Sequence, residues 1–348
     1  MNGTEVVGSF SALDVGLDSV RLAEMLGNFQ DNWILEAFAY MPIDRKLVID
    51  SGETELRELL KIAVGAMQQA GIRSKNVALS LPKQLAYVDV IQMPAQDQKS
   101  VGKLMQYQAN QYIPIDIEAA QLDYCILGSN PNDLTKIDVM VAAVKYQEAE
   151  KWRKAFAEFG LNLVRIEPDD IAVARALMPY GNGGVSLLVF MNEDEIRVTT
   201  CFQDKPRAFK TINLGFDVLM ERISAKLQME RNKTRSLVAS VGFFTDQYDG
   251  QLAKLLDEEI GVVTVELVKI IDEIKLNYAG KEIDEIILGG FLTIMPAVAQ
   301  YFQLKFNLPA RMGNPFQKVN LSAEQKQALE PVAGEFSTVV GLAEAEGK

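Results

Sequence analysis

The chain has 348 residues, of which 48% are hydrophobic, and this length suits two domains better than one small core. The net charge of −12 disfavours binding to nucleic acid or to anionic lipid. The sequence contains no histidine, which excludes histidine-based catalytic triads and histidine metal sites.

The amino-terminal residues show no basic stretch followed by an apolar core, so we expect no signal peptide. No apolar run approaches the roughly 18 residues that a membrane-spanning helix needs. We therefore expect a cytoplasmic protein. Cys125 and Cys201 lie far apart among apolar neighbours, which predicts buried, reduced thiols in strands.

Hydrophobic periodicity in the first half of the chain predicts short strands alternating with amphipathic helices. Turns are expected at Gly16 and at Gly27, and Gly71 ends the first helix. The expected strands cover residues 8–25, as a hairpin, and 33–40, 76–81, 86–93, 121–128, 136–144 and 162–167. The expected helices cover residues 54–70, 98–112, 147–159 and 169–178.

The second half begins again with a strand meander and continues into helices, which indicates a weak duplication of architecture. Glycines at 181, 183 and 184 make this the preferred boundary between two lobes. The expected strands are 185–191, 195–202, 207–212 and 283–288. The expected helices are 214–229, 231–239, 248–259, 265–279, one after Pro296, and 335–345.

Two glycine turns carry most of the functional information. Asp14 and Gly16 lie between two apolar runs near the start, and Gly289–Gly290 end an apolar run near the end. A phosphate can approach the backbone closely only where no Cβ intrudes. This arrangement is typical of the cleft of two-lobed, actin-like nucleotide-binding folds.

Six short motifs occur in order along the chain. They are Leu13–Gly16 with Ser19–Leu22, Gln111–Ile115 with Leu122–Tyr124, Asp138–Ala143, Leu288–Gly290, Asn314–Phe316, and Glu335–Phe336 with Gly341–Ala343. Together they resemble the PilM family of type IV pilus assembly proteins, which is actin-like and related to FtsA and GspL. The resemblance runs from about Phe10 to Ala343.

The resemblance implies an α/β fold of two lobes, a duplicated ribonuclease H-like architecture with an inserted subdomain of the FtsA type. The implied bounds are 1–184 for the first lobe, with subdomain 1A at 8–76 and 150–184 and the inserted subdomain 1C at 77–149, and 185–348 for the second lobe, with 2A at 185–214 and 263–348 and 2B at 215–262.

The resemblance also implies a function. The expected protein is a scaffold of type IV pilus assembly, recruited to the inner face of the bacterial inner membrane. It would grip the cytoplasmic amino-terminal tail of a PilN-like inner-membrane protein. Pilus motor ATPases or the platform protein are further implied partners.

For ATP with Mg²⁺, the resemblance implies a first phosphate loop that is largely present. Asp14 would hold the metal, Gly16 and Ser19 would lie against phosphate, and Arg21 replaces the family's usual lysine. Gly289 and Gly290 would lie against the nucleoside.

The other two loops depart from the family pattern. Phe190 stands where an acid is usual and Asn192 where a glycine is usual, and three carboxylates follow at 193–195. We expect these three to form a solvated acidic turn that repels phosphate. Phe291 and Leu292 replace the small residues beside a purine. We therefore predict weak or lost nucleotide binding and assign no catalytic residue.

The partner site is predicted at the junction of the inserted subdomain, where an extended peptide could lie. The residues assigned to it are Met93, Gln111, Tyr112, Ile113 and Pro114. An acidic surface suits a tail with arginine or lysine. Two alternatives stay open, an active Mg-ATP switch of the same family and a GspL-like component of a type II secretion pseudopilus. The oligomeric state also stays open.

Overall fold

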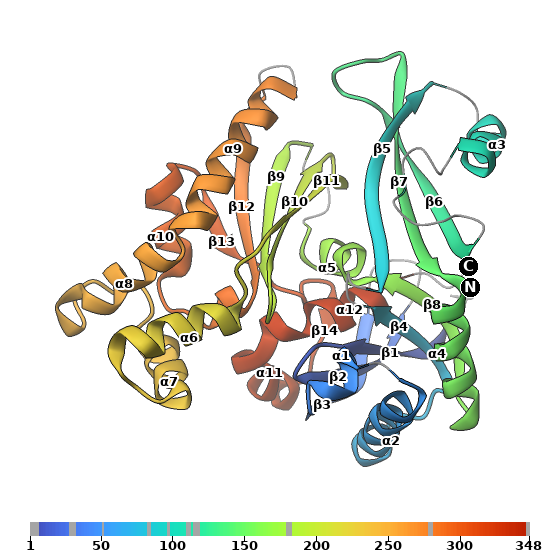
Figure 1. Ribbon diagram of the computed structural model, residues 1–348, viewed down its shortest axis with the longest axis horizontal. Coiled ribbons are helices and arrows are strands. Elements are labelled where there is room, and N and C mark those ends of the chain that lie inside the picture. Colours follow the sequence, from blue (N-terminus) through green and yellow to red (C-terminus); the bar gives the residue numbers. More distant parts are fainter. Residues whose placement is uncertain are drawn as a thin grey trace, which may run out of the picture. The chain divides into compact units, whose positions relative to one another are not determined.

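The computed structural model describes residues 7–27, 33–50, 52–81, 85–95, 98–108, 113, 119–178, 183–277 and 281–345. They form two compact units. The first unit comprises the chain up to Ala176, Pro315–Glu330, and the chain from Phe336 onward. The second unit comprises Leu177–Asn314 and Pro331–Glu335. Each unit is built on one mixed sheet flanked by helices (Figure 1).

The first unit contains a six-stranded sheet in the order β14-β3-β2-β1-β4-β8. Its strands β1, β2 and β3 form an antiparallel meander, and β4, β8 and β14 pair in parallel with their neighbours. The bounds are β1 (Val7–Val15), β2 (Ser19–Gly27), β3 (Trp33–Pro42), β4 (Asn76–Leu81), β8 (Asn162–Pro168) and β14 (Val319–Asn320).

Side chains alternate between the two faces of this sheet, and the side chains on one face are larger than those on the other. Leu13, Val15 and Leu22 pack into a core with α2 (Glu53–Ala70) and α4 (Tyr146–Glu158). The opposite face carries small residues such as Ala12 and Ala23. These let α12 (Ser337–Ala343) pack closely against β1, β2 and β4, beside α5 (Asp169–Leu177).

A three-stranded antiparallel sheet, order β5-β7-β6, also belongs to the first unit. Its strands are β5 (Ala86–Pro94), β6 (Ala120–Ser129) and β7 (Lys136–Lys145). Apolar side chains on one of its faces form a core with α3 (Gln98–Gln108). The short helix α1 (Lys46–Ile49) follows β3, and α11 (Ala323–Leu329) begins with a capping box at Ser322.

The second unit repeats the strand plan of the first. Its five-stranded sheet has the order β11-β10-β9-β12-β13, again an antiparallel meander followed by parallel strands. The strands are β9 (Val185–Met191), β10 (Ile196–Phe202), β11 (Lys205–Ile212), β12 (Ile283–Gly290) and β13 (Ala310–Met312). This repeated order confirms the predicted α/β duplication.

Helices of the second unit share one apolar core with its sheet. They are α6 (Phe216–Leu227), α7 (Arg231–Val241), α8 (Gln251–Glu259), α9 (Gly261–Asn277), η4 (Phe291–Ile294) and α10 (Val298–Phe306). The short 3₁₀ segment η3 (Tyr248–Gly250) precedes α8. The 3₁₀ segment η5 (Glu330–Phe336) begins and ends with residues of the first unit, and its residues Pro331–Glu335 belong to the second unit.

Two predicted subdomain assignments need correction. Residues 76–81 belong to the six-stranded sheet, because β4 pairs with β1 and β8. Residues 315–330 and 336–345 belong to the first unit and not to the second lobe, because β14 pairs with β3 and α12 is buried against β1, β2 and β4.

The two cysteines also differ from each other. Cys201 is buried on β10 as expected, but Cys125 on β6 is exposed, so the expectation of a buried thiol was wrong there. Burial raises the pKa of the Cys201 thiol well above its ordinary value. Among the described residues, no helix combines the length and apolar composition needed to cross a bilayer.

Candidate functional site

The first glycine turn joins β1 to β2 as a tight hairpin. The Gly16 amide donates a hydrogen bond to the Ser19 carbonyl at 3.0 Å, and the register places Asp14 opposite Arg21. Ser19 is buried. The sequence therefore placed the turn correctly, and the four residues assigned to it lie together.

Asp14 and Arg21 form a buried ion pair. Arg21 Nη1 lies 2.8 Å from Asp14 Oδ2, and each side chain is only 7% exposed. A buried carboxylate bonded to a guanidinium already has its charge compensated. A Mg²⁺ ion at Asp14 would meet a carboxylate whose charge Arg21 already compensates. The two residues thus neutralise each other, whereas the resemblance implied Asp14 as a metal ligand and Arg21 as a replacement for the family's lysine in the nucleotide site.

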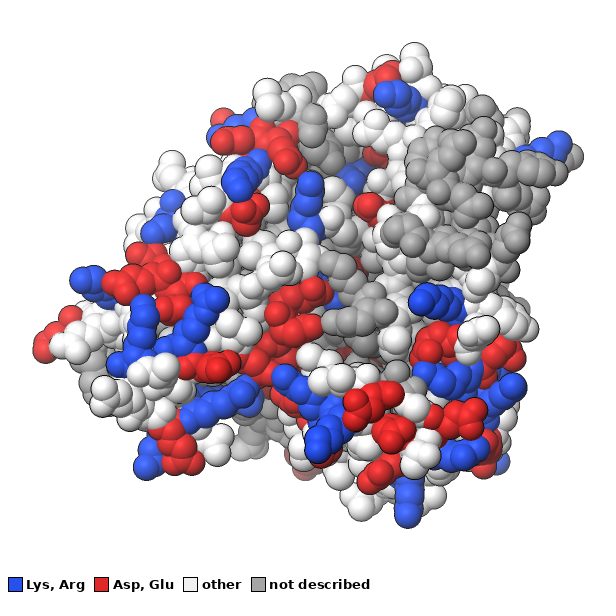
Figure 2. Space-filling model, viewed as in Figure 1, with Lys and Arg blue, Asp and Glu red and all other residues white. Residues whose placement is uncertain are grey.

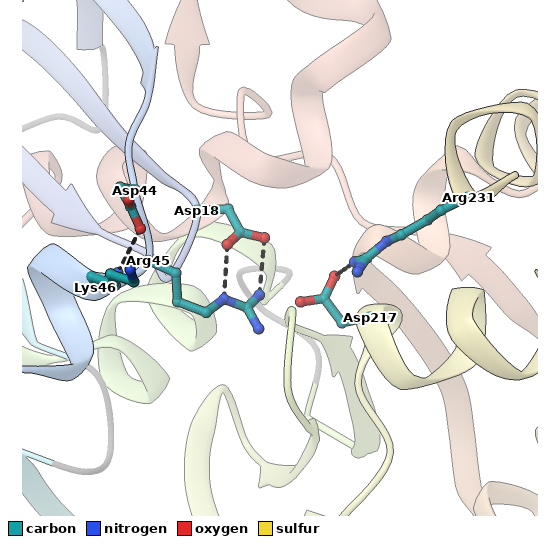
Figure 3. Close-up of polar contacts among 6 residues, drawn as sticks. All are labelled: Asp18, Asp44, Arg45, Lys46, Asp217 and Arg231. Atoms are coloured by element: carbon teal, nitrogen blue, oxygen red, sulfur yellow. Dashed lines mark hydrogen bonds and ion pairs between the residues drawn. The ribbon is translucent and has the colours of Figure 1, made fainter.

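The turn is also fixed from outside by a second ion pair. Arg45 donates to both carboxylate oxygens of Asp18, at 2.9 and 3.0 Å (Figure 3). Asp44 accepts a bond from the Lys46 amide at the start of α1 in the same view. These contacts hold the segment after β3 against the hairpin within the first unit.

The second glycine turn, Gly289–Gly290, needs glycine for close packing. Gly290 has φ +62°, and a Cβ there would lie 2.2 Å from the Met191 carbonyl oxygen. The Thr293 hydroxyl donates to the Gly290 carbonyl at 2.7 Å. A Cβ on Gly334 would lie 2.7 Å from the same carbonyl. The bare backbone of this turn is therefore packed against other protein atoms of the second unit.

The side chain after this turn is stacked inside the protein. The Phe291 ring lies 4.6 Å from the Phe216 ring at an interplanar angle of 8°. The Arg235 guanidinium lies over both rings, 5.4 Å from Phe216 and 5.8 Å from Phe291. Phe216 and Phe291 are 2% and 6% exposed. Stacking adds about 0.5–1.5 kcal/mol to the burial of such a pair, so a purine would have to displace a stable contact.

The acidic turn between β9 and β10 is buried. Glu193 and Glu195 are 6% and 9% exposed, so the expectation of a solvated turn was wrong. Arg197 Nε bonds Glu195 Oε1 at 2.7 Å. Desolvation, and then the neighbouring Glu195, raise the pKa of Asp194. The turn is therefore partly desolvated, and its Glu195 carboxylate is already paired with Arg197.

Carbonyls of this turn take the first amides of α6. The Phe216 amide donates to Asn192 O and the Asp217 amide to Glu193 O, both at 2.9 Å. A free helix N-terminus can bind phosphate, but these two donors are already used. Asp217 is also paired with Arg231 (Figure 3). The second unit therefore fits a phosphate poorly at both turns.

Of the predicted partner residues, two are described, and both are core residues. Met93 and Ile113 are 1% and 4% exposed and pack with α3 against the three-stranded sheet. Their side chains are not available to a peptide in this arrangement. Gln111, Tyr112 and Pro114 lie outside the described residues, so their assignment stays a prediction.

The structure instead has an apolar hollow elsewhere in the first unit, which the sequence analysis missed. Its enclosed space is about 10 Å³, which is room for about one water molecule. It lies between α1, α2, α4 and the start of β5. It is lined by Val15, Leu47, Val48, Leu56, Leu59, Leu85, Lys151 and Trp152.

The polar rim of this hollow is fixed by Glu148. This carboxylate accepts a bond from the Trp152 indole at 2.9 Å and pairs with Lys151 at 2.8 Å.

On the described part of the face in Figure 2, acidic and basic side chains are interspersed, so the negative charge is not gathered into one patch there. Within the described residues no cluster of three or more acidic or cysteine side chains could hold a metal.

The fold and the two glycine turns define an actin-like protein. A chain of the "PilM-PilN type IV pilus biogenesis complex" matches with a TM-score of 0.76 and 20% identity, over 96% of this chain and 97% of that one. MreB5 of Spiroplasma citri bound to ADP matches with a TM-score of 0.55 and 11% identity, over 96% and 94%. EutJ of Carboxydothermus hydrogenoformans, an ethanolamine utilization protein, gives 0.53 and 11%, over 98% and 91%.

The family model for "Type IV pilus assembly protein PilM" matches residues 12–198, more than half of the chain. The chain belongs to the PilM family of type IV pilus assembly proteins.

Proposed function

We propose that this protein is an actin-like scaffold that binds the cytoplasmic amino-terminal tail of a PilN-like inner-membrane protein and has a degenerate nucleotide site. Membership of the PilM family supports a role in pilus assembly. The similarity to a chain of a PilM–PilN complex, over nearly all of both chains, supports a PilN-like partner. Binding to such a tail would place the protein at the inner face of the inner membrane.

The apolar hollow of the first unit is the proposed docking place for the tail. Extended peptides commonly bind by placing alternate side chains in apolar pockets. The hollow offers aliphatic walls with Trp152 and the Lys151–Glu148 pair at its rim. The hollow is small, so an aliphatic side chain of the tail would enter it as the lining side chains move apart, with its polar neighbours outside.

The observation that carries the nucleotide part of the proposal is the stacked Phe216–Phe291 pair under Arg235. The Asp14–Arg21 pair supports it from the first unit. Solved MreB5 structures from Spiroplasma citri are described as bound to ADP or AMPPNP. In this chain, Asp14 at the first turn is paired with Arg21, and Phe291 after the second turn is stacked on Phe216.

The test is titration of a synthetic tail of the co-encoded PilN-like protein, followed by the fluorescence of Trp152 in a Trp33→Phe background. Leu47→Glu should weaken binding at least tenfold, because it places a carboxylate in the apolar hollow. A tenfold change in affinity corresponds to roughly 1.4 kcal/mol. Ile49→Glu on the same short helix is the matched control, since Ile49 is 62% exposed and does not line the hollow. Equal affinities for the two variants would place the tail elsewhere.

Calorimetric titration with Mg-ATP tests the nucleotide part. We expect no binding tighter than roughly 10 µM, about −7 kcal/mol. Tighter binding would instead identify the protein as a nucleotide-dependent switch of the same family.

A further inference from the structure

The outer face of α9 in the second unit carries exposed aliphatic side chains that its core does not use. Other residues of the helix, such as Leu267, face the core. Spacings of three and four residues place the exposed ones along one stripe of the helix. Single exposed aliphatic residues are ordinary, but four along one helix face indicate an interaction surface. The four are Val262, Val265 and Val268, which are 46%, 56% and 46% exposed, and Leu276, which is 83% exposed.

Charged residues interrupt this stripe in a self-complementary order. Lys269 and Asp272 lie between Val265 and Leu276, with side chains 61% and 66% exposed. Within the helix they make only surface pairs three residues away, Lys269 with Glu266 and Asp272 with Lys275. Such pairs are weak and can be rearranged at little cost.

The order of these residues selects the orientation of a second copy. In an antiparallel pair of α9 helices, the register that sets Val265 against Leu276 also sets Lys269 against Asp272. By symmetry each contact occurs twice, as a twofold interface requires. A parallel pair would instead oppose Lys269 to Lys269 and Asp272 to Asp272, which is repulsive. We propose that the outer face of α9 is a self-association surface that binds a second copy of this chain, antiparallel and twofold symmetric.

The area available predicts a weak dimer. A single pair of helix faces buries less than the roughly 1,200 Å² of stable interfaces, so association is expected at micromolar concentrations. In this register the two Val265–Leu276 contacts would supply the attraction and the two Lys269–Asp272 pairs would fix the alignment, while Val262 and Val268 lie outside these pairs.

The test uses sedimentation equilibrium of the full-length chain between 5 and 500 µM, a range chosen to bracket a dissociation constant of order 10 µM. The wild-type chain should dimerise, and Val265→Glu should weaken dimerisation at least tenfold. Leu304→Glu on α10 is the control, since Leu304 is 84% exposed in the same unit but lies outside the stripe. Circular dichroism checks that each variant keeps its helical content.

Two charge reversals make the test independent of folding defects. Lys269→Glu and Asp272→Lys should each be monomeric alone, since like charges then meet twice. An equimolar mixture of the two variants should dimerise, because the carboxylate introduced at position 269 of one copy meets the ammonium introduced at position 272 of the other. The wild-type pair of Lys269 with Asp272 forms at the second contact.

A monomeric wild-type chain at the highest concentration of this range would overturn the proposal. So would a dimer that is unaffected by the α9 variants, because it would use another surface.

Discussion

At the scale of single residues, the two candidate turns are closed by side chains that bind one another. The guanidinium of Arg21 forms an ion pair with the carboxylate of Asp14, and the ring of Phe291 stacks on the ring of Phe216. In both cases a residue that could face a ligand instead has a protein partner. Each of these contacts lies within one unit of the chain.

The Asp14–Arg21 pair makes a first prediction, on stability. Arg21→Met should lower the free energy of unfolding by about 3–5 kcal/mol, because a buried carboxylate is left without its guanidinium. The double variant Asp14→Leu with Arg21→Met should recover most of that loss, since two apolar groups can replace a buried ion pair. Urea unfolding of the two single variants and the double variant measures this coupling. Strictly additive losses would mean that the pair does not act as a unit.

At the scale of single elements, α12 shows how closely backbones approach in the first unit. A Cβ on Gly341 would lie 1.8 Å from the Ala172 carbonyl oxygen on α5. Arg175 Nη1 donates to the Gly341 carbonyl at 2.6 Å, and Lys318 pairs with Glu344 at 2.8 Å. The helix is thus held by one close crossing and by buried polar contacts at its end.

Gly341→Ala should therefore destabilise the protein by at least about 2 kcal/mol, since backbone atoms must move apart. Gly65→Ala on α2 is the contrasting change. A Cβ on Gly65 meets no atom within 4 Å, and alanine favours a helix interior over glycine by roughly 0.5–1 kcal/mol. Thermal unfolding should move the two melting temperatures in opposite directions. A neutral Gly341→Ala would contradict the close crossing.

The acidic turn 192–195 makes a prediction about pH. The pKa of Asp194 is raised by burial, so its ionised form is less favourable in the folded chain than in the unfolded chain. The unfolded carboxyl ionises around its ordinary value of 3.8, and the folded one at higher pH. The stability that Asp194 contributes is therefore present at low pH and is lost as pH rises through that window.

Asp194→Asn should remove this loss. The free energy of unfolding, measured by urea titration at pH 4 and at pH 7, should fall by less between these two pH values in the variant than in the wild-type chain. An identical pH dependence in wild type and Asp194→Asn would contradict the desolvated position of the turn.

At the scale of the whole molecule, the carboxyl-terminal segment completes a unit that the amino-terminal segment begins. The strands β3 and β14 are nearly 280 residues apart in sequence yet adjacent in the six-stranded sheet. The side chains of Val339, Val340 and Leu342 on α12 are fully buried in the first unit. The first unit therefore depends on residues from both ends of the chain.

A chain ending at Gly334 should fail to fold its first unit. Loss of three buried aliphatic side chains removes on the order of 5–9 kcal/mol, which is comparable with the whole stability of a typical domain. A chain ending at Ala345 keeps α12 and is the control. Limited proteolysis, read by mass spectrometry, should cleave the shorter chain throughout the first unit. Resistance equal to the control would mean that α12 is dispensable.

Most strands and helices could be predicted from the sequence, because periodicity, glycine turns and prolines are local signals. The short elements α1, α11, β13 and β14 were not predicted. The sequence motifs also identified the family, and the family model confirmed it. The hairpin of Asp14, Gly16 and Arg21 was predictable because its residues are neighbours in sequence. The burial of Met93 was not, since the same alternating pattern serves a core and a groove.

The sequence by itself determined most element types, the duplicated α/β plan and the family, since these depend on short-range patterns that one chain displays directly. Only the tertiary structure decided that Phe216 covers Phe291, that the acidic turn is buried, and that residues 315–330 and 336–345 join the first unit. These facts depend on contacts between segments distant in sequence. Such contacts are settled by packing and register, which no local pattern specifies.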